Sequence, residues 1–182
     1  MKALLIIDIQ NDYFPGGANP LTGSKEAGLN AKRLLDFFRL KKWNIIHVQH
    51  LSKSSSFFVE GTMGAEIQKD LMPAAGEKHI IKQHPNAFRE TDLAEYLESR
   101  GIDKLVVCGM MTHMCIDTSV RAAKDKGYEI DLIHDACATK DLKWNEQIIP
   151  ASQVHMSYLA ALKGNFADMW STQEYVERAK IE

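Results

Sequence analysis

The amino-acid sequence predicts an α/β fold of three layers, in which a doubly wound, mostly parallel sheet of about six strands has helices on both faces. Short apolar runs alternate along the chain with longer segments of helical periodicity, and this alternation is typical of a parallel sheet. The N-terminal run from Ala3 to Ile9 is apolar on both faces except at Asp8, as expected of a central strand. The length of 182 residues and the 45% of hydrophobic residues suit a sizeable core, so residues 1–182 are predicted to form a single domain.

Composition and charge favour a small-molecule partner. The formal charge is −2, without a long run of one sign, which argues against nucleic-acid binding and against a polybasic membrane patch. No segment approaches the ~20 apolar residues of a membrane span, and the N-terminal run is too short for a signal peptide, so a cytoplasmic location is expected. The three cysteines are an odd number without a CxxC pair, which favours neither a disulfide framework nor a cysteine-based zinc site.

The first half of the chain shows the alternation expected of strand–helix units. Residues 24–43 carry apolar side chains at helical spacing with Lys and Arg between them, which predicts the first crossover helix. Two apolar segments then predict the second and third strands, Asn44–Gln49 and His79–Ile81. Between them, residues 50–73 have no periodicity, and a loop of that length is usually functional or disordered. The adjacent Phe57 and Phe58 favour an ordered loop, one that either folds over an apolar group or is simply anchored to the core.

The second half continues the same alternation. A short amphipathic helix is predicted at Thr91–Arg100, because Leu93 and Leu97 lie four residues apart and Gly101 follows as a stop. An apolar strand follows at Asp103–Cys108. The remaining predicted elements are a helix at Cys115–Lys126, a strand at Tyr128–His134, a helix at Ala151–Lys163 and a sixth strand at Asn165–Met169.

Three reactive or charged groups fall where predicted strands end. Asp8 lies near the end of the first strand, Lys82 at the end of the third and Cys115 just after the fourth. Because the carboxyl ends of parallel strands share one edge of the sheet, where ligands bind, we expect these groups to converge. A thiol, a cation and a carboxylate together suit a nucleophilic site. The alternatives are that Asp8 caps the following turn, or that a buried Lys–Asp ion pair has an uninvolved thiol beside it.

Cys115 is predicted to lie in the first turn of a helix. Partial positive charge at a helix N-terminus favours the thiolate, so the pKa of Cys115 is expected below the usual ~8.5. The alternative is that the thiol only packs in the interior, as free cysteines often do.

Five segments resemble a known family in sequence and in order: DIQND (Asp8–Asp12), FVEGTMGAEI (Phe58–Ile67), KQHPNAF (Lys82–Phe88), GMMTHMC (Gly109–Cys115) and DACAT (Asp135–Thr139). They span nearly the whole chain, which resembles the amidohydrolase branch of the isochorismatase-like cysteine hydrolases. The resemblance implies the isochorismatase-like hydrolase fold and an Asp8-Lys82-Cys115 triad. It also implies attack by Cys115 on a carboxamide-type carbonyl of a small molecule, loss of ammonia or an amine, and hydrolysis of the thioester. Asp8 would move protons and Lys82 would stabilise charge.

The resemblance also implies the surroundings of the nucleophile. The backbone N–H groups of Met111 and Cys115 would form the oxyanion hole, and the peptide bond joining Met110 to Met111 would be cis. Five residues on loops above the same sheet edge are candidate substrate contacts: Tyr13, His50, Phe57, Phe58 and His113. For His113 the alternative is that it only fixes the turn from Gly109 to Cys115.

The sequence favours metal-independent amide hydrolysis within this family. Isochorismate-cleaving members tend to lack the cysteine, whereas this chain has Cys115. Nicotinamidases hold a metal ion through an aspartate and histidines after the second strand, but here His47 and His50 lie three residues apart on a strand and point to opposite faces, which makes a poor chelate. No metal and no other cofactor is therefore predicted. An isochorismatase-type or nicotinamidase-type hydrolase is the alternative.

Assembly and two other protein classes stay open at this point. Relatives are commonly oligomeric, so a homodimer or homotetramer is expected, with a small-molecule substrate as the other partner. A non-catalytic small-molecule-binding protein or a thiol-redox protein would also suit this fold and this cysteine. A redox protein usually needs a resolving thiol, and the sequence does not say whether Cys108 or Cys137 approaches Cys115.

Overall fold

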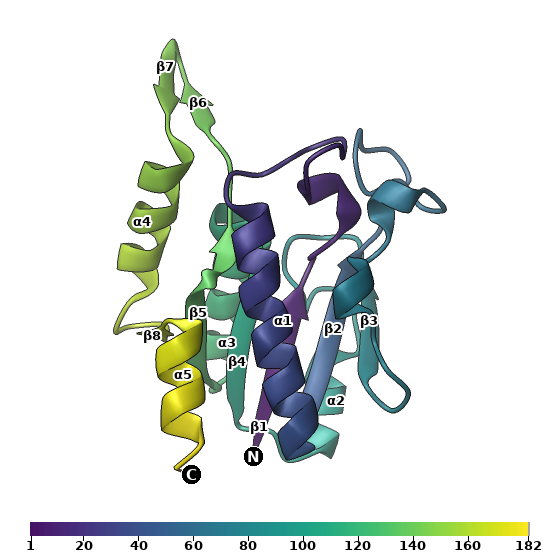
Figure 1. Ribbon diagram of the computed structural model, residues 1–182, viewed down its shortest axis with the longest axis vertical. Helices are drawn as coiled ribbons and strands as arrows, with labels where there is room; N and C mark the ends of the chain where they lie inside the picture. Colours follow the sequence, from purple (N-terminus) through teal and green to yellow (C-terminus); the bar gives the residue numbers. More distant parts are fainter. Residues whose placement is uncertain (182) are drawn as a thin grey trace.

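The computed structural model describes residues 1–181, and its main sheet has six strands in the order β3-β2-β1-β4-β5-β8. Every neighbouring pair is parallel, so the predicted fold class is confirmed. The strands are β1 (Lys2–Ile7), β2 (Asn44–His50), β3 (Lys78–Lys82), β4 (Lys104–Met110), β5 (Glu129–Ala138) and β8 (Asp168–Trp170). Their carboxyl ends share the edge of the sheet opposite the N-terminus (Figure 1).

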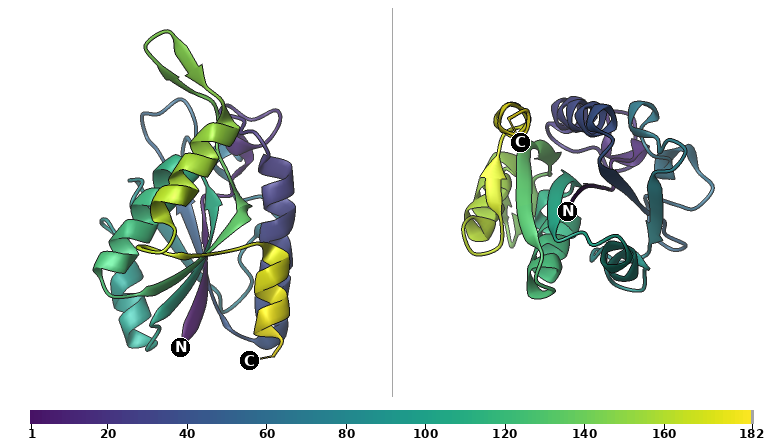
Figure 2. Two further views of the ribbon diagram at one scale, coloured as in Figure 1. Left: turned by 90° about the vertical axis from the view of Figure 1, so that its left-hand side faces the viewer. Right: turned by 90° about the horizontal axis from the view of Figure 1, so that it is seen from below.

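Five α-helices cover the two faces of the sheet. Helices α1 (Ser24–Lys41) and α5 (Thr172–Ala179) lie on one face, while α2 (Leu93–Ser99), α3 (Asp117–Asp125) and α4 (Ala151–Leu162) lie on the other, as Figure 2 shows. Alternate residues of β1 enter different cores: Leu4 and Ile6 pack with α1 and α5, whereas Ala3, Leu5 and Ile7 pack with the opposite helices. This two-sided burial is the reason why β1 is apolar on both faces.

The strand order reverses direction at β1. The chain moves outward on one side through β2 and β3, then returns to the other side of β1 with β4 and β5. Such a switch point opens a crevice at the carboxyl ends of the two central strands, where doubly wound proteins bind their ligands. Asp8 follows β1 directly, and the segment that holds Cys115 follows β4.

Two expectations about local structure were wrong. The helix predicted to begin at Cys115 begins at Asp117, and Cys115 lies in a π-helical turn, Thr112–Ile116. Such turns interrupt α-helices and recur at functional sites. The predicted alternation also omitted helix α5 and an antiparallel hairpin of two short strands, β6 (Leu142–Trp144) and β7 (Gln147–Ile149). The hairpin projects beyond the body of the molecule above α4 (Figure 1).

The long segment between β2 and β3 is ordered around two 3-10 helices, Met63–Ala65 and Lys69–Leu71. A third, Asn11–Tyr13, follows β1 and contacts the first of them. The Asn11–Tyr13 helix and the first part of the β2–β3 segment lie above the carboxyl edge of the sheet (Figure 1). Among residues 1–181, none of the helices combines the length and the apolar character needed to cross a membrane.

Candidate active site

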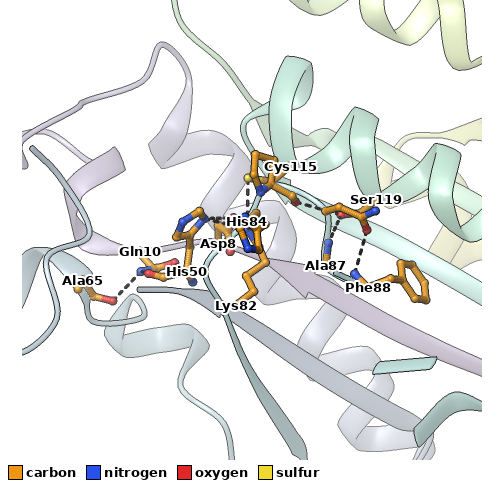
Figure 3. Close-up of polar contacts among 12 residues, drawn as sticks. Asp8, Gln10, His50, Ala65, Lys82, His84, Ala87, Phe88, Cys115 and Ser119 are labelled. Carbon is orange, nitrogen blue, oxygen red and sulfur yellow. Dashed lines mark hydrogen bonds and ion pairs between the residues drawn. The ribbon is translucent and has the colours of Figure 1, made fainter. Parts of the chain in front are cut away.

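Asp8, Lys82 and Cys115 meet at the carboxyl edge of the sheet (Figure 3). The Lys82 Nζ lies 2.7 Å from Asp8 Oδ2 and 3.3 Å from Cys115 Sγ. All three side chains are buried, and Cys115 is the most accessible of them at 4%. The predicted convergence of these three residues is therefore observed.

Local backbone geometry brings Asp8 toward its partners. Asp8 has a φ of 52°, in the left-handed region that non-glycine residues seldom adopt. Its N–H nevertheless donates to the Val48 carbonyl at 3.0 Å, so the residue stays attached to β2 while the chain leaves the strand. On the other side of β1, Gly109 has a φ of 137°, and a Cβ built there would lie 2.0 Å from the Ile7 carbonyl oxygen. Only glycine allows β4 to approach the end of β1 so closely.

Lys82 is surrounded by four acceptor atoms. Besides Asp8 and Cys115, its ammonium group contacts His50 Nδ1 at 3.0 Å and the His84 carbonyl at 3.0 Å. Burial lowers the pKa of Lys82, but the interactions of its ammonium group with the Asp8 carboxylate and the Cys115 sulfur outweigh burial and raise the pKa above its usual value. Lys82 therefore stays protonated, as a fixed cation in the site.

His50 is neutral and has a defined tautomer. An ammonium group can only donate, so Nδ1 of His50 accepts from Lys82 and the ring proton is on Nε2. Burial first, and then the charge of Lys82, lower the pKa of His50. Gln10 fixes the backbone of His50: its Nε2 donates to the His50 carbonyl at 2.8 Å, and its Oε1 accepts from the His50 N–H at 2.8 Å.

Cys115 is a thiol in the resting site, and the expected lowering of its pKa was wrong. Burial raises the pKa of Cys115 most, and the Asp8 carboxylate raises it further, whereas Lys82 lowers it. The expectation rested on the end of a helix alone, whereas burial of the thiol is the largest influence on its pKa. Asp8 Oδ1 is buried and has no hydrogen-bond partner among residues 1–181, so it is an oxygen that can accept a proton.

The site does not suit a metal ion while Lys82 is present. In the described part of the chain, the one group of three candidate ligands is Asp8, His50 and Cys115, whose ligand atoms lie within 4.8 Å of one another. The Lys82 ammonium group contacts all three of these residues, so it already fills the position of a cation. His47 lies elsewhere, with its Nε2 2.8 Å from Glu77 Oε2.

Three aromatic side chains border the site. The Tyr13 ring centroid lies 4.5 Å from that of Phe58 and 5.9 Å from that of Phe57, and Phe58 lies 5.9 Å from the His50 ring. Burial raises the pKa of Tyr13 most, and the Cys115 sulfur when it is a thiolate and the Asp8 carboxylate raise it further, so the Tyr13 hydroxyl group lies near the charged groups of the site. Tyr13, Phe57, Phe58 and His50 therefore lie where the sequence placed candidate substrate contacts.

His113 has a different position. Its Nδ1 lies 2.6 Å from Thr139 Oγ1, and its ring centroid lies 6.0 Å from that of Tyr158. The neighbouring Thr112 hydroxyl lies 2.9 Å from His155 Nδ1. These contacts tie the turn before Cys115 to β5 and α4, which favours the alternative that His113 fixes the turn.

The turn that precedes Cys115 has the cis peptide bond that the resemblance implied. The peptide bond between Met110 and Met111 is cis. The Met111 carbonyl accepts from the N–H groups of Met114 at 3.0 Å and Ile116 at 3.2 Å, which fixes the peptide planes around the thiol.

The three cysteines are free in the structure. Cys108 belongs to the core on the α1 side of the sheet, whereas Cys115 and Cys137 belong to the core on the opposite side. Cys108 is therefore not placed to act as a resolving thiol for Cys115.

Sequence reasoning missed two features of this site. His50 was expected only as a substrate contact, and its hydrogen bond with Lys82 was not foreseen. Asp12, which is buried beneath the aromatic side chains, received no role. A signal for Asp12 was available, since it is an acidic residue next to Tyr13 in the DIQND segment, and an acid in a buried loop needs partners.

Comparison with known proteins agrees with this geometry. The family model described as the isochorismatase domain matches residues 2–174. YddQ of Bacillus subtilis (strain 168), an isochorismatase family protein, is 44% identical over 177 residues, which cover 96% of this chain and 98% of YddQ. A crystal structure from Oleispira antarctica, described as an isochorismatase hydrolase, superposes with a TM-score of 0.94 at 43% identity and covers 97% of this chain and 96% of that chain.

More distant relatives have names that specify a reaction. A streptothricin hydrolase of Streptomyces noursei is 27% identical and matches 97% of this chain but 61% of its own length. Nicotinamidase 3 of Arabidopsis thaliana is 27% identical, with 87% of this chain and 81% of its own length covered. The family match over most of the chain, together with YddQ and the shared fold, establishes that this chain belongs to the isochorismatase family of hydrolases.

Proposed function

We propose that this protein is a metal-independent cysteine hydrolase that cleaves a carboxamide-type C–N bond of a small molecule through a thioester on Cys115. The observation that carries the proposal is the buried contact of one ammonium group with both a carboxylate and a thiol, at 2.7 Å and 3.3 Å. Streptothricin hydrolase and nicotinamidase 3 among the relatives support a hydrolytic reaction of this kind.

The first half of the reaction forms the thioester. Asp8 takes the proton of the Cys115 thiol while the sulfur attacks the carbonyl carbon of the substrate. The resting thiol is protonated, so this transfer coincides with the attack, and Lys82 keeps the negative charge on sulfur stable as it develops. The N–H groups of Met111 and Cys115 stabilise the oxyanion. When the C–N bond breaks, protonated Asp8 gives its proton to the departing nitrogen, which leaves as ammonia or an amine.

The second half regenerates the enzyme. Asp8, again a carboxylate, takes a proton from water while the water oxygen attacks the thioester carbon. Collapse of this intermediate breaks the C–S bond and releases the carboxylic acid, and the proton held by Asp8 returns to sulfur. His50, with its proton on Nε2, offers a neutral donor to the substrate beside this path.

A paired set of cysteine variants tests the proposal. Carboxamides of several classes, with nicotinamide, carbamoyl and maleamate-type compounds among them, are screened for ammonia release with and without a chelator. Cys115→Ala is expected to lower turnover of any substrate found by more than about 1000-fold, because the nucleophile is lost. Cys137→Ala, which removes another buried thiol, is the matched control and is expected to retain activity.

Trapping of the intermediate completes the test. Mass spectrometry of the acid-quenched reaction is expected to find the acyl group on the peptide that contains Cys115. Full activity in Cys115→Ala would refute the proposed nucleophile, and loss of activity with a chelator would refute the metal-independent reaction.

We also propose that the protein assembles as a homodimer or homotetramer. Helix α4 has no Asp, Glu, Lys or Arg, and it exposes Met156, while the preceding hairpin exposes Trp144 and Ile148. A second copy of this chain is the partner that suits this surface, because α4 packs against its own copy about a two-fold axis without like-charge repulsion. Sedimentation velocity is expected to find an oligomer that Ile148→Lys dissociates; a monomeric parent chain would contradict this.

A further inference from the structure

Asp12 joins two loops that cover the site. It lies in the 3-10 helix after β1, and its carboxylate is 94% buried. Asp12 Oδ2 accepts from the backbone N–H of Phe58 at 2.6 Å, and Oδ1 accepts from the backbone N–H of Ala18 at 3.0 Å. The first of these is short, as expected when the acceptor is charged. Asp12 thereby holds the backbone of Phe58, which lies 46 positions further along the chain.

The backbone conformation of Phe58 needs a hydrogen bond of this kind to keep it in place. Its φ is 57°, and a bulky residue with positive φ is strained unless its surroundings fix it. The ring is 1% exposed and lies between Tyr13 and His50, with centroids 4.5 Å and 5.9 Å away. Because His50 contacts Lys82 and Lys82 contacts Cys115, the Phe58 ring lies beside the first residue of the chain of contacts that leads to the thiol.

Two glycines pack closely against Asp12. A Cβ built on Gly64 would lie 2.2 Å from Asp12 Oδ1, and a Cβ built on Gly17 would lie 2.5 Å from Asp12 Cα. Either side chain would displace Asp12 from the Phe58 N–H. Gly64 therefore packs directly against the carboxylate of Asp12, and Gly17 packs against its backbone.

We propose that Asp12 is a positioning residue that keeps the segment around Phe58 closed over Cys115, and that release of the hydrogen bond to the Phe58 N–H opens the site to its substrate. The importance of this closure for turnover rests on the proposed function. Asp12 does not touch the reacting atoms; it acts through Phe58, which excludes water from the thiol in the closed state.

Alkylation of the resting thiol tests the closure without a substrate. Asp12→Asn keeps the size of the side chain but turns one of its two acceptors into a donor. Iodoacetamide is expected to label Cys115 at least about tenfold faster in this variant, since a hydrogen bond to a charged group is lost. Asp70→Asn neutralises an exposed carboxylate and is the matched control, for which no change is expected. Peptide mass spectrometry assigns each label to its cysteine.

The buried Cys108 and Cys137 separate local opening from general unfolding. Faster labelling of Cys115 alone supports the proposal. Faster labelling of all three cysteines, or a Cys115 rate within about twofold of the Asp70→Asn control, overturns it.

A double variant tests whether Asp12 acts through Phe58. Phe58→Ala alone is expected to expose Cys115, and adding Asp12→Asn is then expected to increase labelling by less than about twofold, because the two changes remove the same closure. If the effects of the two substitutions on the labelling rate of Cys115 multiply in the double variant, the proposal is overturned. Labelling needs no turnover, so these results stand even if no amide substrate is found. Failure of the proposed hydrolysis is detected separately, in the ammonia-release assay.

Discussion

At the scale of single residues, Lys82 determines the electrostatics of the site. Its ammonium group contacts both Asp8 and Cys115, and it fixes the tautomer of His50. Its position followed from the sequence, because a charge at the carboxyl end of an apolar strand must lie at the functional edge. The state of Cys115 did not follow, because the pKa of a buried thiol depends on how completely loops far away in sequence exclude water.

Lys82→Met is expected to lower both stability and activity. The variant leaves the Asp8 carboxylate buried without its counterion, and breaking a buried pair in this way costs about 3–5 kcal/mol. Turnover is expected to fall by at least about 100-fold, since the developing charge on sulfur loses its nearest cation. Urea unfolding and the ammonia-release assay measure the two effects.

The chain offers a control for this substitution. Lys32 forms an exposed ion pair with Asp36 at 2.5 Å, and Lys32→Met is expected to change the free energy of unfolding by less than about 0.5 kcal/mol. In the double variant Asp8→Asn/Lys82→Met, stability is expected to recover in part while activity does not. A Lys82→Met protein as stable as Lys32→Met would contradict a role for this buried pair.

At the scale of elements, β1 and β4 hold the site together. Gly109 lets β4 pass the end of β1, and the π-helical turn then carries Cys115 toward Asp8. The strands and most helices followed from apolar periodicity. The hairpin β6–β7 did not, because its three-residue strands are mostly exposed and lack an alternating pattern. Helix α5 could have been found, since Ser171 and Glu174 form a capping box at its start.

Gly109→Ala is expected to destabilise the protein by more than about 4 kcal/mol. The added Cβ would lie 2.0 Å from the Ile7 carbonyl oxygen, so β1 and β4 would have to separate. Gly101→Ala is the control, because Gly101 also has a positive φ, 62°, but has no atom within 4 Å of the added Cβ. That change is expected to cost about 1–2 kcal/mol, the strain of a left-handed residue. If urea unfolding finds the same loss of unfolding free energy in both variants, close packing at Gly109 contributes nothing to stability.

At the scale of the whole molecule, histidines link stability to pH. Five have pKa values below the ordinary 6.5, and loss of contact with water is the first cause in each case: the buried His47, the partly buried His50, His113 and His155, and the more exposed His79. The native state therefore holds these rings neutral where the unfolded chain would protonate them. His47 is the most completely enclosed, with 1% exposure and a buried Nδ1 that has no hydrogen-bond partner among residues 1–181.

Stability is expected to fall as the pH decreases below about 6.5. In that range the unfolded chain binds more protons than the native state, so each histidine contributes a loss of up to about 1.4 kcal/mol per pH unit until its own native pKa is reached. Above about pH 6.5 this contribution is fully present. Urea unfolding at about pH 7.5 and about pH 5.5 measures the slope. His47→Gln, which can still donate to Glu77 but does not titrate, is expected to show a flatter slope than the parent; an equal slope would contradict the role of His47.

The four contacts of the Lys82 ammonium group bear on whether the cell has to supply a metal ion to this site. Two oxygens, one nitrogen and one sulfur surround it, and atoms of these kinds are the ligands of a tetrahedral metal ion. A metal ion has to be acquired from the cell and retained against competing ligands. In the metal-independent reaction proposed above, the charge of Lys82 takes the place of such an ion and is synthesised with the polypeptide, so hydrolysis is expected in a medium without metal ions.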